Sequence, residues 1–373
     1  MKFNVGSLFA GVGGICLGFQ QAHNGEDSYK LCFANEIDAY ACETYRTNFT
    51  HPLLEGDIHK FLKPELASNK EEKEYYESQR HYFFDNKIDV LNGGFPCQAF
   101  SVAGEQKGFE DERGNLFLQI IELINQMGEH QGKPRVLFLE NVKNLLAHDK
   151  GRTYKVIKSK LEECGYIITE KVLNTMDYTN LPQNRERIYI VGFLNKEDFD
   201  KFTYFERADK LIIKRSKKER AEQVDKILEK DMNIENGYEY YYTKEKYPHY
   251  FKDELDAVNL ARDMTESHQF YQCRRGMYVR KNMSNVCPTL TANMGTGGHN
   301  VPLILVEDGI RKLTPTETFR LQGFPVGNGY KLPTTFNGRK YPNSMLYKQA
   351  GNAVSVEMIK ILAEEILKAL KNE

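Results

Sequence analysis

The sequence predicts an α/β fold, with a doubly wound and mostly parallel sheet in a first domain and a smaller, irregular second domain. Segments with strand-like and helix-like patterns alternate from residue 1 to about residue 194. A glycine turn, FAGVGG at 9–14, joins the first strand to the first helix. From 195 to about 285 the chain is charged, rich in tyrosine and weakly periodic. Alternating strands and helices favour parallel strands with helices on both faces.

Each predicted element has its own pattern. The expected strands are short apolar runs at 3–9, 31–37, 88–94, 135–141 and 187–194. The expected helices cover 14–23, 38–49, 115–126, 153–165 and 353–373. Asp38 is a candidate N-cap, and Gly165 ends one of these helices. The last helix is expected to pack on the first domain, so that 1–194 and 335–373 form one domain and 195–334 the other.

Composition is that of a folded protein without a membrane span. The chain has 373 residues, of which 40% are hydrophobic and 28% charged, and its mean hydropathy is −0.58. No apolar run is long enough for a bilayer, and the N-terminus lacks the apolar core of a signal peptide. Seven scattered cysteines without CxxC spacing predict neither a disulfide framework nor a metal site. The expected location is the cytoplasm.

Charge is informative only locally, because the net charge is −1. The stretch KRSKKER (214–220) continues into a helix-like segment and is interpreted as a solvated helix face. The stretch RRGMYVRK (274–281) contains no acid and interleaves tyrosine and glycine with its cations. This second pattern favours binding to nucleic acid.

The glycine turn and two carboxylates indicate a nucleotide-like cofactor. Glycines between a strand and a helix let the backbone approach a ligand at the helix N-terminus. Glu36 ends the second strand, where α/β nucleotide-binding proteins place an acid that holds ribose hydroxyls. Asp57, in GDI (56–58), falls where a third strand should end and is placed to meet an adenine edge. These features fit NAD, FAD and S-adenosylmethionine (SAM) equally well.

Reactive groups stand at further strand ends. Cys97 follows IDVLNGGFP, and Glu140 lies in FLENV (138–142). Because the C-terminal strand edges of a doubly wound sheet line one crevice, Cys97 and Glu140 are expected to converge. Arg185 and Arg187, in QNRERIY (183–189), come before their apolar run, so their approach to the crevice is left open.

Six blocks, taken in order, resemble the bacterial type of cytosine-C5 DNA methyltransferase found in restriction–modification systems. They are SLFAGVGG, GGFPCQAFSVAG, ENV, QNRER, RKLTPTETFRLQGFP (311–325) and YKQAGNAVSV (347–356), and they span nearly the whole chain. Ser7 departs from the pattern, because the family often has Asp there. The resemblance implies a Rossmann-like methyltransferase domain, SAM as cofactor and a target-recognition domain. It also implies duplex DNA as partner, a possible cognate restriction endonuclease and a place at the nucleoid.

By this resemblance Cys97 is a nucleophile that adds to carbon 6 of a flipped-out cytosine and activates carbon 5 for methyl transfer. Glu140 would hydrogen-bond ring N3, and Arg187 would hold O2. Arg185 would lie beside Arg187 as a second contact or a phosphate anchor, while Asn141 would fix the local turn. The residues expected to bind SAM are Phe9, Gly11, Gly13, Gly14, Glu36, Ile37, Asp57, Ile58, Gly94, Pro96, Leu116, Asn352 and Val354.

The expected DNA contacts lie in two regions. The segment 101–117 resembles the family's loop that closes over the flipped base, and 287–304 resembles its threonine–leucine element. The expected contacts are Ser101, Arg113, Arg274, Arg275, Arg280, Lys281, Thr291, Gly297 and Gly298.

Three alternatives stay open at this point. An RNA cytosine-C5 methyltransferase of the transfer-RNA type shares the catalytic blocks. A nicotinamide-dependent oxidoreductase shares the glycine turn but offers no joint role for Cys97, Glu140 and Arg187. A catalytically inert DNA-binding relative is disfavoured because every candidate catalytic residue is present.

Overall fold

The computed structural model describes residues 1–95, 116–254, 257–274, 277–282, 285–294 and 301–370. The chain divides into two compact units. Unit 1 comprises Met1–Leu173, Glu186–Leu211 and Met358–Glu373, and unit 2 comprises Asn174–Arg185 and Ile212–Glu357. Among the described residues, no helix has the length and apolar character needed to cross a membrane.

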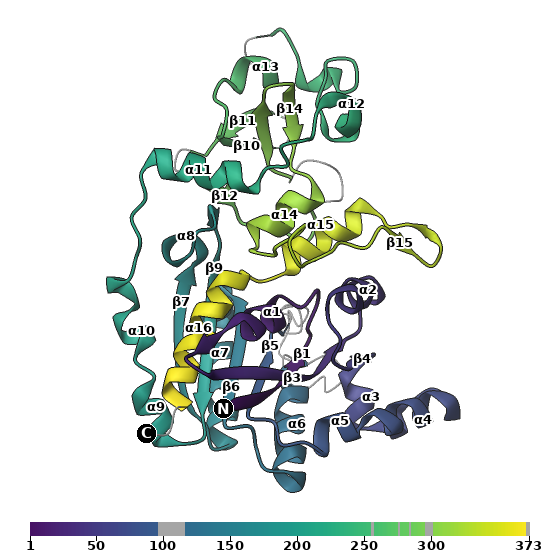
Figure 1. Ribbon diagram of the computed structural model, residues 1–373, viewed down its shortest axis with the longest axis vertical. Helices are drawn as coiled ribbons and strands as arrows, with labels where there is room; N and C mark the ends of the chain where they lie inside the picture. Colours follow the sequence, from purple (N-terminus) through teal and green to yellow (C-terminus); the bar gives the residue numbers. More distant parts are fainter. Residues whose placement is uncertain (96–115, 255–256, 275–276, 283–284, 295–300, 371–373) are drawn as a thin grey trace. The chain divides into compact units, whose positions relative to one another are not determined.

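Unit 1 is built on an eight-stranded sheet with the order β2-β3-β1-β5-β6-β9-β7, and β4 pairs with β3 (Figure 1). The strands are β1 (Lys2–Leu8), β2 (His23–Asn24), β3 (Asp27–Glu36), β4 (Leu53–Glu55), β5 (Val90–Gly93), β6 (Val136–Val142), β7 (Ile167–Asn174) and β9 (Glu186–Phe193). The pairs β1–β3, β1–β5, β3–β4 and β5–β6 are parallel, whereas β2–β3 and β6–β9 are antiparallel. The predicted mostly parallel sheet is confirmed.

Helices cover both faces of this sheet. The helices of unit 1 are α1 (Gly14–Gln21), α2 (Ala39–Asn48), α3 (Ile58–Leu62), α4 (Lys70–Gln79), α5 (His81–Phe84), α6 (Leu116–His130), α7 (Arg152–Glu163), α9 (Lys196–Lys201), α10 (Tyr204–Arg207) and α16 (Val356–Leu370). On one face, Phe19 of α1 packs edge-on against Phe138 of β6. On the other, Leu137 of β6 shares a buried cluster with Ile120 of α6 and Ile157 of α7. This two-sided packing makes the sheet doubly wound.

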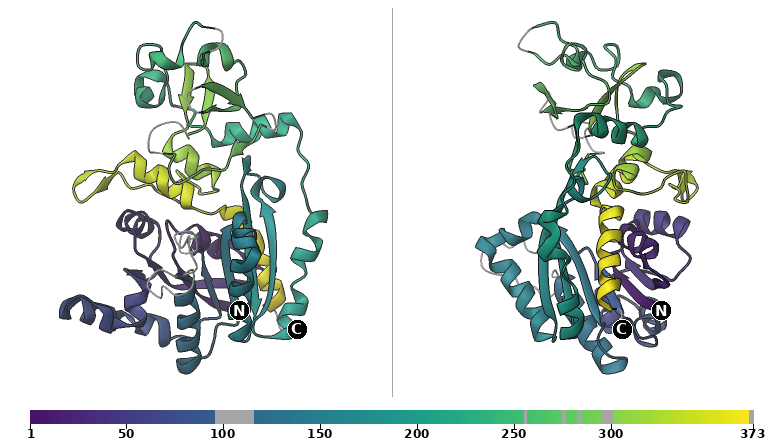
Figure 2. Two further views of the ribbon diagram at one scale, coloured as in Figure 1. Left: turned by 180° about the vertical axis from the view of Figure 1, so that it is seen from behind. Right: turned by 60° about the vertical axis from the view of Figure 1, so that its left-hand side comes forward.

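Three local predictions are confirmed. Asp38 caps α2, since its Oδ1 accepts a hydrogen bond from Ala41 N at 3.0 Å. Gly165, with φ of 95°, follows the end of α7. The C-terminal helix α16, drawn in yellow, runs along the strands of unit 1 (Figure 2). It is joined to β3 by a hydrogen bond, in which Tyr29 Oη donates to Ala363 O at 2.8 Å.

Unit 2 contains a smaller antiparallel sheet with the order β11-β10-β13-β14. The strands of unit 2 are β8 (Gln183–Asn184), β10 (Phe270–Arg274), β11 (Tyr278–Lys281), β12 (Cys287–Pro288), β13 (Leu303–Val306), β14 (Gly309–Lys312), β15 (Thr335–Phe336) and β16 (Arg339–Lys340). Its helices are α8 (Thr175–Tyr178), α11 (Lys217–Ile227), α12 (Ile234–Gly237), α13 (Leu260–Asp263), α14 (Pro315–Leu321) and α15 (Asn343–Asn352). Tyr242, Tyr250 and Tyr271 supply much of its core, which explains the tyrosine-rich composition.

The compact units do not follow the predicted domain boundaries. Packing places 174–185 and 335–357 in unit 2, whereas the sequence assigned both segments to the larger domain. The physical reason is that Gln183 and Asn184 pair with Cys287 and Pro288, and that Arg185 donates to Leu290 O and Gly351 O. The predicted division by function, at 194 and 335, stays a prediction.

Candidate active site

Glu140 and Arg187 form a buried ion pair at the C-terminal end of β6. Arg187 Nε lies 3.1 Å from Glu140 Oε1, and the two side chains are 12% and 9% exposed. The sequence left the approach of Arg187 open. Because β9 is antiparallel to β6, its first residues meet the last residues of β6, and Val142 pairs with Arg187. A Cβ atom on Gly94 would lie 3.5 Å from Glu140 Oε2, so the glycine leaves room beside the carboxylate.

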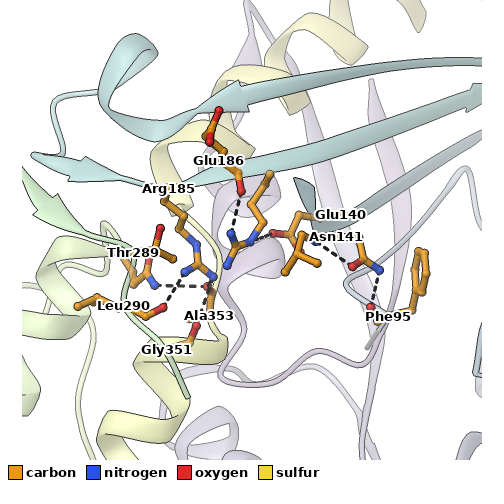
Figure 3. A network of polar contacts seen from close by, with 12 residues as sticks. Phe95, Glu140, Asn141, Arg185, Glu186, Thr289, Leu290, Gly351 and Ala353 are labelled. Atoms are coloured by element: carbon orange, nitrogen blue, oxygen red, sulfur yellow. Dashed lines mark hydrogen bonds and ion pairs between the residues drawn. The ribbon is translucent and has the colours of Figure 1, made fainter. Parts of the chain in front are cut away.

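Asn141 holds the backbone that leads toward Cys97. Its Nδ2 donates to Phe95 O at 2.9 Å, and its Oδ1 accepts from Val142 N at 2.8 Å (Figure 3). The amide therefore fixes the chain immediately before Pro96. Pro96 and Cys97 lie outside the described residues.

The glycine turn is tied to the end of β3 through Glu36. Glu36 Oε2 accepts a hydrogen bond from Gly11 N at 2.7 Å. Its Oε1 accepts from Ile37 N at 2.9 Å and from Asp38 N at 2.8 Å. A Cβ on Gly11 would meet nothing within 4 Å, so open space adjoins the turn at this residue. The sequence-predicted pair of glycine turn and strand-end acid is thus in direct contact.

Backbone conformation explains why the turn is rich in glycine. Phe9, Gly11 and Gly13 all have positive φ, at 53°, 55° and 84°. A Cβ on Gly13 would lie only 2.2 Å from the ring of Phe49, so a side chain there is excluded. Gly14 then begins α1.

Four further cofactor candidates lie in unit 1. Asp57 is the N-cap of α3, and its Oδ1 accepts from His59 N at 3.0 Å. Ile58, the next residue, is buried, whereas Ile37 is 68% exposed directly after Glu36. Leu116 begins α6 and is half-buried. The cofactor roles of these residues stay predictions.

A buried polar cluster under the glycine turn was missed by sequence reasoning. Ser7 Oγ donates to Asn92 Oδ1 at 2.6 Å, across the pair β1–β5. Tyr45 Oη donates to Cys16 Sγ at 3.0 Å and lies 2.6 Å from His51 Nε2. Burial raises the pKa of the Cys16 thiol and lowers the pKa of His51 to about 4, so both groups are neutral at pH 7. The available signal was the polar Asn92 within the apolar run IDVLNGG.

Arg185 has a different environment, within unit 2. Its side chain is 2% exposed. The guanidinium donates to the carbonyl oxygens of Leu290 and Gly351, at 3.2 and 3.3 Å, and to that of Ala353 (Figure 3). Contacts with three backbone carbonyls favour a role in positioning these segments over the expected contact with a base or phosphate.

Replacing Arg185 by methionine is expected to lower the free energy of unfolding by roughly 2–4 kcal/mol, because several buried carbonyls each lose a donor at about 1–3 kcal/mol. Urea unfolding followed by circular dichroism measures the loss. The matched control is Arg215→Met, since half-buried Arg215 also donates to a carbonyl, that of Met176 at 3.3 Å. The control is expected to cost less than about 1 kcal/mol. Equal losses in the two variants contradict the positioning role.

The contacts around Arg185 form a junction between the threonine–leucine element (287–304) and the segment AGNAV (350–354). Gln183 Oε1 accepts from Leu290 N at 3.4 Å, and its Nε2 donates to Leu321 O at 2.9 Å. A Cβ on Gly351 would lie 2.3 Å from the Thr291 backbone, so the two segments are in direct contact. Asn352 is exposed and Val354 buried in this junction, and their cofactor role stays a prediction.

The expected DNA contacts are only partly described. Arg280 and Thr291 are exposed, Arg274 is half-buried, and Lys281 forms an ion pair with Glu266. The expected residues Ser101, Arg113, Arg275, Gly297 and Gly298 lie outside the described residues.

Comparison with known proteins decides the family. The model of the C-5 cytosine-specific DNA methylases matches residues 3–368. The chain belongs to the C-5 cytosine-specific DNA methylase family. It is a DNA cytosine-5 methyltransferase, and the RNA and nicotinamide alternatives are set aside. The resemblance in the six sequence blocks is confirmed.

Relatives of this methyltransferase match over nearly its full length. It is 44% identical to the type II methyltransferase M.Bsp6I from Bacillus sp. (strain RFL6) over 367 residues, which cover 98% of this chain and 99% of the relative. It is 34% identical to the type II methyltransferase M.HpaII from Haemophilus parainfluenzae over 376 residues, covering 100% and 91% of the two chains.

Solved structures of low sequence identity support the fold of the methyltransferase. The crystal structure of S. pombe Dnmt2 methyltransferase matches with a TM-score of 0.63 at 17% identity, covering 100% of both chains. A Spodoptera frugiperda DNMT2 mutant matches with a TM-score of 0.61 at 18% identity, covering 98% of this chain and 99% of the other.

Proposed function

We propose that this methyltransferase is the modification enzyme of a type II restriction–modification system. It transfers a methyl group from SAM to carbon 5 of a cytosine flipped out of a specific duplex sequence. The observation that carries the proposal is the buried Glu140–Arg187 pair beside Gly94. Gly94 lies on the segment that leads to Cys97. The type II names of its relatives support the same assignment.

The proposed chemistry starts from the poor nucleophilicity of cytosine carbon 5. The Cys97 thiolate adds to carbon 6, and Glu140, which takes up a proton when the base is bound, donates it to ring N3 as negative charge develops. The resulting enamine attacks the methyl group with carbon 5. Loss of the carbon 5 proton to a base, with return of the N3 proton to Glu140, then allows the Cys97–carbon 6 bond to break and restores the aromatic ring. Arg187, held by Glu140 in this structure, is placed to donate to O2 of the pyrimidine.

The side chains of unit 1 fit SAM, which supplies the electrophilic methyl group when bound. The open space beside Gly11 offers room for the ligand. Glu36 Oε2 accepts only the Gly11 N–H among the described groups, which leaves a lone pair for a ribose hydroxyl. Asp57 would accept from the adenine amino group, and the exposed Ile37 would cover the face of the base.

Replacing Glu36 by alanine is expected to weaken binding of S-adenosylhomocysteine about 10- to 100-fold, because hydrogen bonds to a charged acceptor contribute roughly 1.5–3 kcal/mol. Isothermal titration measures the effect without turnover. The matched control is Asp38→Ala, which removes the N-cap of α2 and leaves Glu36 in place. The control should lose about 1 kcal/mol of stability and bind the ligand within twofold of the parent. Unchanged binding in the Glu36 variant overturns its assigned contact.

The function is tested by sequencing 5-methylcytosine in DNA from bacterial cells that express the protein, with Cys97→Ser as the inactive control. The proposal expects methylation at one recurring sequence context. Absence of methylated cytosine indicates an inert relative, and methylation spread over unrelated contexts contradicts a sequence-specific modification enzyme. The cognate endonuclease, where one exists, is identified as a nuclease that the methylated context resists. We propose that the enzyme acts in the cytoplasm, at the nucleoid, where its DNA substrate lies.

A further inference from the structure

The strands β10 and β11 form a two-stranded ribbon at the edge of the sheet in unit 2. Tyr271 pairs with Lys281 and Cys273 with Val279, in antiparallel register. Tyr271, Cys273 and Val279 pack into the tyrosine-rich core. Since side chains alternate along a strand, the residues between them point to the opposite face.

That opposite face carries polar and cationic groups. Gln272 is directly opposite Arg280, and Arg274 is opposite Tyr278. Arg280 Nη2 donates to Gln272 Oε1 at 3.0 Å, so one guanidinium edge is held in place. Tyr278 is 57% exposed, and Met277 beside it is 67% exposed. None of the four side chains on this face is acidic. We call Gln272, Arg274, Tyr278 and Arg280 the open face.

Lys281, although adjacent in sequence, belongs to the other face. Its Nζ donates to Glu266, and Glu266 also pairs with Lys217 at 3.2 Å. Its hydrogen bonds with Lys281 and Lys217 lower the pKa of Glu266, as expected for a carboxylate held by two cations. Lys281 is therefore committed to a contact within unit 2. The structure thus separates two cations that the sequence placed in one group.

We infer that the open face enters the major groove of the DNA substrate and that Arg280 reads a guanine of the recognised sequence, with Gln272 as its positioning residue. The inference rests on the proposed function. The major groove, about 12 Å wide, admits a two-stranded β-ribbon. An arginine fork pairs with O6 and N7 of guanine, and no other base presents this pair of acceptors. Holding the guanidinium through Gln272 lowers the rotamer entropy lost on binding.

The test measures sequence preference. Purified protein methylates a duplex library in which each position of the recognised site is varied, and sequencing gives the methylation of each variant site. Arg280→Ala is expected to reduce the preference at one G·C pair by about tenfold or more, the range that a bidentate base contact supplies. Gln272→Ala is expected to reduce the preference at the same pair by a smaller factor. The matched control, Lys281→Ala, keeps the parent's preference at every position.

Arg280→Lys separates a base contact from a phosphate contact, because lysine keeps the charge and lacks the fork. The inference expects this variant to lose the guanine preference while retaining its affinity for DNA. Equal methylation losses at all sites, with preference intact, indicate a phosphate contact and overturn the inference. A preference unchanged in both Arg280 variants overturns it as well. Absence of duplex methylation by the unaltered protein overturns the proposed function, and this inference with it.

Discussion

The Cys97→Ser variant loses methyl transfer by at least about 10⁴-fold, on the scale seen when a covalent nucleophile is removed. A serine hydroxyl is not ionised at pH 7 and adds poorly to carbon 6, so carbon 5 stays unreactive. Binding of S-adenosylhomocysteine stays within twofold, because Cys97 is not among the residues assigned to the cofactor. Single-turnover transfer of labelled methyl groups measures the first quantity, and isothermal titration the second.

Cys32→Ser is the control for this substitution. Cys32 is a half-buried thiol of β3, and the same one-atom change there should leave both quantities unaltered. Loss of cofactor binding together with activity in Cys97→Ser would mean that Cys97 supports the structure and is not the nucleophile.

The Glu140→Gln variant lowers the rate of methyl transfer about 10²- to 10⁴-fold, the range for removal of a general acid. Glutamine keeps the size of the side chain but supplies no acidic proton to ring N3. Arg187 also loses its anionic partner at 3.1 Å, so its hold on the pyrimidine weakens. Single-turnover rates at saturating DNA and SAM measure the loss.

Glu55→Gln is the control for this substitution. Glu55 also pairs with an arginine, Arg46, but at the surface of unit 1, with 39% of its side chain exposed. A surface pair contributes little, so this variant should transfer methyl groups within twofold of the parent rate. A parent-like rate in Glu140→Gln would remove Glu140 from the mechanism.

The site in unit 1 follows closely from the sequence, because strand ends in an α/β sheet meet at one edge. Gly11 and Glu36 were expected near each other for this reason, and they share a hydrogen bond. The direction of β9 could not be predicted, since an apolar run is compatible with either direction. Its antiparallel pairing is what places Arg187 beside Glu140.

Long-range contacts explain where prediction stopped. Arg185 and Arg187 are two residues apart, yet one donates to backbone carbonyls of unit 2 and the other pairs with Glu140. No local pattern separates these two environments. The ribbon β10–β11 was not predicted as strands either, because its strands have only 5 and 4 residues and Lys281 puts a cation on the core side of the alternation.

The central claim is a transient bond between Cys97 and carbon 6 of the target cytosine. It is tested by incubating the protein with SAM and a duplex whose target base is 5-fluorocytosine, then denaturing the mixture and mapping any protein–DNA adduct by mass spectrometry. Fluorine at carbon 5 replaces the proton that must leave, so the account predicts a stable adduct on Cys97. A preparation that methylates the ordinary duplex but forms no adduct at Cys97 would contradict it.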